Sequence, residues 1–142
     1  MHLFNILSIF GIFLLLGVEL CVSAFINPVM RQLDAEPQAK ALSLFASLLG
    51  GVMPFWYGGC FLMLAAQAWL HRGTTAYPWL LIAAVLWVAV IVFTVAVLVP
   101  INNRIAARSS SNWQQEHRRW DSLHRLRVLV LAISAFCLLW GL

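Results

Sequence analysis

Four long apolar stretches constrain this chain more than any other feature of its sequence. Hydrophobic residues make up 63% of the 142 residues and charged residues only 10%, whereas a soluble domain carries about 25% charged residues. A stretch of about 20 apolar residues is long enough to cross a bilayer as a helix. The sequence therefore predicts an all-α, integral membrane four-helix bundle, with residues 1–142 forming a single transmembrane domain. The helices are expected over residues 3–26, 41–70, 77–99 and 112–140.

Prolines and one capping pattern set the predicted ends of these helices. Because proline disfavours helix at the residue before it, the first helix is predicted to end near Pro28 and the third to close at Pro100. Pro54 lies inside the second apolar stretch and predicts a kink there. Ser111, followed three residues later by Gln114, is typical of a capping box and predicts that the last helix starts near residue 112.

The distribution of Lys and Arg predicts the orientation of the helices. The first stretch is interpreted as a membrane helix, because no Lys or Arg precedes it and it exceeds the apolar core of about 7–15 residues of a signal peptide. With four helices, the first and third connections share one side, and the positive-inside rule places them in the cytoplasm with both termini outside. The basic residues on that side are Arg31, Lys40, Arg104, Arg108, Arg118 and Arg119, against only Arg72 on the other.

A stripe of aromatic and basic residues precedes and enters the last apolar stretch. Spacings of four, three, four and three connect Trp113, His117, Trp120, His124 and Arg127. Residues three and four apart lie on one face of a helix, so these five side chains are predicted to form a single stripe. We expect Trp113 and His117 to lie in the membrane interface. The other three are expected to reach a site inside the bundle.

Glu19 is the only charged residue in the first apolar stretch. An ionisable group inside a membrane helix is costly and by default indicates a functional site, although a plain buried ion pair that orients helix packing is the structural alternative. Its expected partner is Arg127 or His124. The predicted site is a pocket inside the bundle that opens toward the first and third connections.

Composition and residue spacing argue against several other kinds of site. The formal charge of +4 is explained by orientation and requires no nucleic acid partner. The three isolated cysteines, Cys21, Cys60 and Cys137, are expected to be buried packing residues. Two histidines seven residues apart with one distant Glu are poor spacing for a metal site, so no metal is predicted. The expected partners are the lipid bilayer and a small aromatic or hydrophobic ligand, and the oligomeric state is left open, a homo-oligomer included.

Two motifs give the chain a resemblance to a known family. The run Val99-Pro100-Ile101-Asn102-Asn103-Arg104, a short polar insert, and then Trp120-x-x-x-His124-x-x-Arg127 before a last apolar helix resemble the DUF1772 or anthrone oxygenase-like family. The proline at the end of the first helix, in Asn27-Pro28, is similar as well. The resemblance implies four membrane helices. It also implies oxidation of an anthrone to an anthraquinone by molecular oxygen, without metal or flavin.

The resemblance favours an enzyme and carries over to particular residues. A base would deprotonate an acidic C–H of the substrate, and a cationic donor would stabilise the resulting enolate oxygen. We expect His124 to be the base, Arg127 the partner of the oxyanion, and Glu19 the residue that sets their protonation. Contacts with a flat phenolic or quinol-type substrate are expected from Trp120, Asn102 and Asn27, with Trp120 as a stacking wall.

Two other classes of function remain open at this point. Small four-helix transporters also use one essential Glu in the first helix, so Glu19 is alternatively a proton-coupling residue. The second alternative is a non-catalytic membrane subunit whose stripe docks a partner. A stripe that faces the bundle interior would favour a site, and a stripe that faces solvent would favour a docking role.

Overall fold

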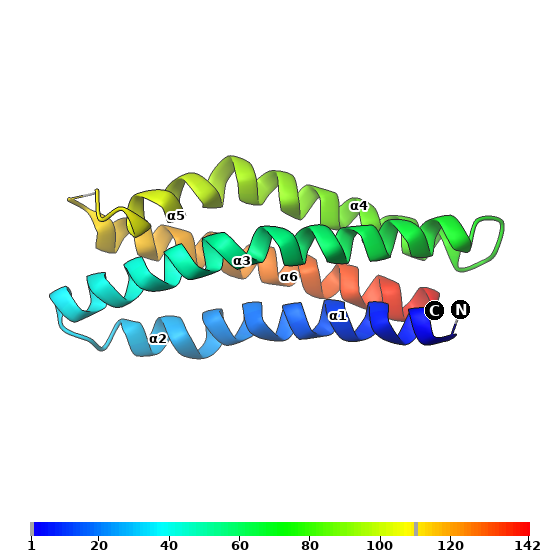
Figure 1. Cartoon of the computed structure of the whole chain (residues 1–142), viewed down its shortest axis with the longest axis horizontal. Coiled ribbons are helices and arrows are strands. Elements are labelled where there is room, and N and C mark those ends of the chain that lie inside the picture. The colour runs from blue at the N-terminus through cyan, green and yellow to red at the C-terminus, as the bar shows by residue number, and fades with distance from the viewer. Residues whose placement is uncertain (1, 110) are drawn as a thin grey trace.

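The computed structural model describes residues 2–109 and 111–142, and these residues form an all-α four-helix bundle (Figure 1). Four helical spans within the described residues are long and apolar enough to cross a membrane. The predicted fold class is therefore confirmed. The two termini lie at one end of the bundle, and the first and third connections lie together at the other (Figure 1). The four spans are His2–Met30, Ala35–Leu70, Tyr77–Ala106 and Trp113–Gly141.

The first and third spans continue through their prolines, so both predicted ends at Pro28 and Pro100 are wrong. In each span a five-residue π-helical segment lies just before the proline. Proline has no N–H and clashes with the carbonyl group four residues earlier in a regular α-helix, and a π-helical turn changes the spacing of these groups. The segments are α1 (His2–Cys21), η1 (Val22–Ile26) and α2 (Asn27–Met30), then α4 (Tyr77–Phe93), η2 (Thr94–Leu98) and α5 (Val99–Ala106).

Backbone hydrogen bonds identify the two π-helical turns. The N–H of Asn27 donates to the carbonyl oxygen of Val22, and the N–H of Val99 donates to that of Thr94. Both bonds span five residues, where an α-helix would span four. Each turn thus lets the helix carry a proline directly afterwards and continue toward the same end of the bundle.

The second and fourth spans are single helices, α3 (Ala35–Leu70) and α6 (Trp113–Gly141). Helix α3 starts six residues before the predicted position, because its N-cap is Asp34 and the helical turns that follow it are partly polar. Pro54 lies inside α3 and does not end it. The N-cap of α6 is Asn112, so the helix starts where it was expected, although Ser111 is not its capping residue.

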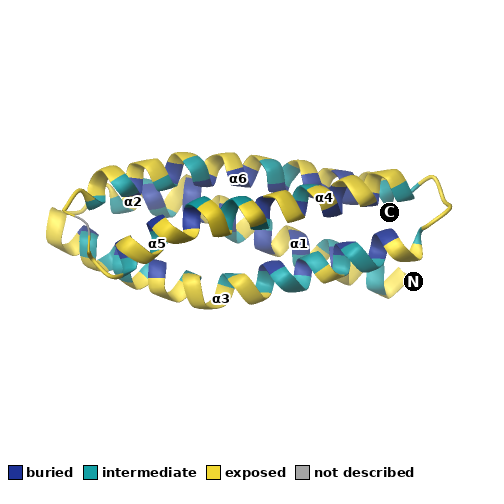
Figure 2. Ribbon diagram, turned by 90° about the horizontal axis from the view of Figure 1, so that it is seen from above, coloured by how far each residue is buried: buried dark blue, intermediate teal, exposed yellow. Residues whose placement is uncertain are grey.

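Buried residues face the interior of the bundle and exposed residues its outer side (Figure 2). Apolar side chains make up most of the interior and also much of the outer surface. The main core includes Leu15, Leu64, Leu80, Trp87 and Leu131. The outward-facing leucines, valines and phenylalanines have lipid as their natural surroundings. Cys60 and Cys137 are buried as predicted, whereas Cys21 is exposed on the outer face.

Candidate active site

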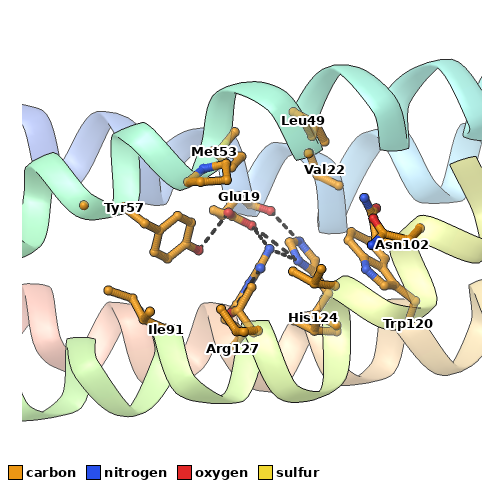
Figure 3. A pocket seen from close by; sticks show the side chains of 18 residues that line it. Glu19, Val22, Leu49, Met53, Tyr57, Ile91, Asn102, Trp120, His124 and Arg127 are labelled. Carbon is orange, nitrogen blue, oxygen red and sulfur yellow. Dashed lines mark hydrogen bonds and ion pairs between the residues drawn. The ribbon is translucent and has the colours of Figure 1, made fainter.

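A cavity of about 310 Å³ lies midway along the bundle and is bordered by all four spans (Figure 3). Most of its lining is apolar, and its polar groups come from α1, α3, η2, α5 and α6. The two π-helical segments both contribute to it. The lining residues are Glu19, Val22, Leu49, Gly50, Met53, Pro54, Tyr57, Gly58, Ile91, Thr94, Val95, Leu98, Val99, Asn102, Asn103, Trp120, His124 and Arg127.

Three of the predicted site residues meet in one buried cluster at this cavity. Arg127 Nη2 donates to Glu19 Oε2 at 2.6 Å and lies 2.9 Å from His124 Nδ1. His124 Nδ1 is itself 3.3 Å from Glu19 Oε2. All three residues are buried. The structure thus pairs Glu19 with both of the residues that were considered as its partner (Figure 3).

The partners of His124 determine which ring nitrogen carries the hydrogen. Nε2 lies 3.0 Å from the backbone carbonyl oxygen of Glu19, and a carbonyl oxygen can only accept a hydrogen bond. Nε2 therefore donates. Arg127 can only donate, so Nδ1 accepts from it and holds the lone pair. His124 is accordingly neutral in this arrangement, and its basic nitrogen lies beside the Glu19 carboxylate.

Two further polar residues of the cavity were missed in the sequence. The hydroxyl of Tyr57 in α3 donates to Glu19 Oε1 at 2.8 Å, and its ring faces the Arg127 guanidinium at 5.5 Å, within the range of a cation–π contact. Thr94, in η2, accepts a hydrogen bond from Arg127 Nη1 at 3.4 Å. The signal that was available is that each hydroxyl lies alone within a long apolar run, over residues 48–66 for Tyr57 and 78–101 for Thr94.

The stripe on α6 forms a stack of rings. Trp120 is nearly parallel to His124, with ring centroids 4.7 Å apart, and to His117, with centroids 6.4 Å apart. His117 precedes Trp120 by one helical turn and His124 follows it by one, so the imidazoles stack toward opposite faces of the indole. Trp120 therefore offers the cavity an edge. His117 is buried near the start of α6 and does not line the main cavity, while Trp113 is partly buried against a small apolar cluster. The interfacial position of both remains a prediction.

Asn27 lies outside the main cavity, in a second polar cluster. Its side-chain amide donates to Asp121 Oδ1, and Asp121 also accepts from Arg31 at 2.9 Å and from Arg125 at 2.8 Å. Asp121 is buried and was missed in the sequence, although its position four residues before Arg125 was a usable signal. The predicted substrate contact of Asn27 is therefore replaced by a packing contact between α2 and α6.

Asn102 lines the main cavity, where it connects two helices. Its amide nitrogen donates to the carbonyl oxygen of Ala46 in α3 at 3.0 Å. A Cβ atom on Gly50 would lie 3.3 Å from the same nitrogen, so the glycine permits this close approach of α3 and α5.

The exposed residues of the cavity lining lie along one side of the bundle. They are Gly50 and Pro54 on α3, Val95 on η2, and Val99 and Asn103 on α5. These residues border the gap between α3 and the η2–α5 segment, through which Figure 3 looks onto Glu19, His124 and Arg127. The opening is therefore on the side of the bundle, and Asn103 is the exposed lining residue that lies nearest the third connection.

Comparison with known proteins adds one match. No curated protein and no solved structure matches the chain. Residues 43–137 match the anthrone oxygenase family, and this match covers more than half of the chain. The matched region contains Tyr57, Asn102, Trp120, His124 and Arg127, and Glu19 lies before it. The chain therefore belongs to the anthrone oxygenase family.

Proposed function

We propose that this protein is a cofactor-independent monooxygenase that oxidises a flat anthrone or quinol-type substrate in the central cavity. The observation that carries the proposal is the buried cluster of Glu19, His124 and Arg127 at the wall of an otherwise apolar cavity. The cluster combines a base and a cationic donor, and the apolar wall suits a flat aromatic ligand. Family membership supports the same type of reaction.

The first step of the proposed reaction is removal of a proton from the acidic carbon of the substrate. His124 Nδ1 is the acceptor, since it holds the lone pair of the neutral ring. The resulting imidazolium is stabilised by the Glu19 carboxylate, whose Oε2 is 3.3 Å away. Protonated Nδ1 can no longer accept from Arg127, and this change frees the guanidinium to donate to the enolate oxygen.

The second step transfers one electron from the enolate to dioxygen. The two radicals combine into a peroxide anion on the carbon that lost the proton, and the proton held by His124 converts this anion into a hydroperoxide. Loss of water then creates the second carbonyl group. The net reaction joins anthrone and dioxygen to give anthraquinone and water, with one oxygen atom retained in each product.

The hydrogen bonds of Glu19 favour this proposal over proton-coupled transport. The carboxylate accepts from Tyr57 and Arg127 and lies beside His124. These contacts tie the carboxylate to α3 and α6 at once. Transport through Glu19 would require them to break and form again in each cycle. The stripe faces the bundle interior from Trp120 onward, which favours a site over a docking role for its inner half.

The proposal is tested by oxygen consumption and product analysis with the purified protein in lipid nanodiscs. The variants are His124→Gln and Arg127→Lys, each checked for a monomodal elution profile and for helix content. Arg118→Lys, on the exposed part of α6, is the matched control. We expect the two site variants to lose at least about 100-fold in kcat/KM, because a positioned base or oxyanion donor contributes at least this factor.

Isotope labelling separates enzymatic oxidation from spontaneous autoxidation. With labelled dioxygen, the protein should incorporate one labelled oxygen atom per quinone at a rate above that of empty nanodiscs. If folded His124→Gln and Arg127→Lys proteins retain the activity of Arg118→Lys, these residues do not perform the chemistry. If no anthrone or hydroquinone is oxidised faster than in empty nanodiscs, the proposed reaction is wrong.

A further inference from the structure

We infer that the substrate of this cavity is an uncharged, membrane-dissolved planar molecule that enters sideways from the lipid, between α3 and the η2–α5 segment. The inference rests on the proposed function and specifies its substrate class. It also assigns a role to residues that take no part in the chemistry. Gly50 and Pro54 on one side, and Val95 and Val99 on the other, form the apolar part of the mouth of the cavity, and the exposed Asn103 continues it toward the third connection. We call the four apolar residues the lateral mouth.

The lateral mouth lies at the depth of the hydrocarbon core. The third span has 30 residues and is about 45 Å long at 1.5 Å per residue, against a hydrocarbon core of about 30 Å. Val95 is about 17 Å from the nearer end of this span, at Ala106. Pro54 is about 24 Å from the nearer end of its own span, at Leu70. Both positions are therefore surrounded by lipid chains when the bundle spans a bilayer.

The chemistry of the mouth suits an apolar ligand. All four residues of the lateral mouth are uncharged, and the side chain of Val95 is 62% exposed. The charged groups of the cavity, Glu19 and Arg127, lie behind the mouth and are paired with each other. An ionic or strongly polar substrate would have to leave water and cross hydrocarbon to reach this opening, which is unfavourable. Dioxygen and an uncharged aromatic ring both dissolve in lipid.

Toward the polar end of the bundle, the main cavity adjoins a much smaller one. The second cavity on that side, which Asn27 and His117 line, has a volume of only about 30 Å³, close to that of one water molecule. Trp120 and Asn102 line both cavities, and they separate this small space from the main one. A three-ring substrate cannot pass through it without displacing these side chains.

The η2 segment gives the mouth its shape on one side. Its π-helical turn contributes Thr94, Val95 and Leu98 to the lining. Thr94 contacts Arg127, while Val95 points outward and is exposed. Substitutions at Val95 therefore change access to the cavity without touching the cluster of Glu19, His124 and Arg127.

The test is binding of anthraquinone, a stable three-ring ligand, to the protein in nanodiscs, compared with binding of anthraquinone-2-sulfonate. Binding is measured as the amount of ligand that the protein-containing nanodiscs retain in excess of empty nanodiscs, and this measurement requires no turnover. Val95→Trp places a large ring in the mouth. Val85→Trp is the matched control, since Val85 lies on the same span, is 58% exposed and does not line the cavity. We expect Val95→Trp to weaken anthraquinone binding at least about tenfold, with Val85→Trp unchanged.

The sulfonate distinguishes access from lipid from access through water. We expect it to bind at least about tenfold more weakly than anthraquinone at equal total concentration, because its fixed charge keeps it out of the hydrocarbon core. Equal or tighter binding of the sulfonate would overturn lateral access, as would equal effects of the two tryptophan variants. A cavity that retains only phospholipid and exchanges it for neither ligand would also overturn the inference. If anthraquinone binds normally but the protein oxidises no anthrone or hydroquinone, lateral access stands and the proposed reaction is rejected.

Discussion

Arg127 Nη2 lies 2.6 Å from Glu19 Oε2, and this contact joins residues 108 positions apart in the chain. It connects α1 to α6 across the interior of the bundle, with both side chains buried. Outside water, an unpaired charge of either sign is strongly unfavourable, so each residue accounts for the presence of the other. The same contact brings His124 into the cluster, because Arg127 bonds both partners with one nitrogen. Packing and the proposed chemistry therefore depend on the same atoms.

Replacing Glu19 by Gln should destabilise the protein strongly. The variant keeps the volume of the side chain but leaves Arg127 as a buried charge without its counter-ion, which typically costs about 3–5 kcal/mol. Glu36→Gln is the control, because the Glu36 side chain is 76% exposed where it pairs with Arg108 and such pairs contribute about 0–1 kcal/mol. Thermal unfolding in detergent measures both. A similar decrease in unfolding temperature for the two variants would show that burial does not strengthen the Glu19 pair.

Removing the hydroxyl of Tyr57 should have a smaller and more local effect. Tyr57→Phe keeps the ring against Arg127 and Trp87 but removes the donor to Glu19 Oε1. A hydrogen bond to a charged group contributes about 1.5–3 kcal/mol. We expect decreased stability and a lower kcat at unchanged KM, because the carboxylate beside His124 loses one of the donors that fix its position. Tyr77→Phe, outside the cavity, should change neither quantity.

Sequence reasoning was sufficient for the four-helix architecture and for the partners of Glu19. A lone acid in an apolar helix requires a counter-charge at its own depth, and the up-and-down order of four helices leaves few candidates, among them His124 and Arg127. These conclusions follow from hydropathy, helical spacing and topology, all of which are properties of the chain alone.

Other features depend on hydrogen-bond register and helix rotation, which the sequence does not specify. Pro28 and Pro100 were expected to end helices, but a π-helical turn before each allows the helix to continue. The burial of His117 depends on how α6 is rotated against α2, where Asp121 bonds to Asn27. The sideways opening of the cavity depends on the separation of α3 from η2, to which no motif corresponds.

Asn27 and Asn102 should respond differently to truncation, although both were expected to contact substrate. Asn27→Ala removes a donor to the buried Asp121 and should lower the unfolding temperature with unchanged anthraquinone affinity. Asn102→Ala removes the bond from α5 to Ala46, worth about 1 kcal/mol, and enlarges the cavity. It should therefore change affinity more than stability. Titration with anthraquinone and thermal unfolding distinguish the two variants. A loss of anthraquinone affinity in Asn27→Ala, but not in Asn102→Ala, would show that Asn27 belongs to the substrate site.

Filling the cavity from α3 should reduce binding without disturbing the polar cluster. Gly58 lines the cavity, and a Cβ atom built on it meets no other atom within 4 Å. Gly58→Leu can therefore place its side chain in the space that the substrate requires. Gly51→Leu is the matched control, because Gly51 lies in the same helix, also has open space at its Cβ, and does not line the cavity.

Both variants replace a helical glycine by leucine. This replacement stabilises the helix by up to about 1 kcal/mol per site. Neither should unfold the protein, so a difference between them reports on the cavity. We expect Gly58→Leu to raise KM or the dissociation constant of anthraquinone at least about tenfold, while the chemical step on bound substrate is less affected. Gly51→Leu should bind and turn over substrate as the unmodified protein does. If Gly58→Leu binds the three-ring ligand normally, the substrate does not occupy this cavity.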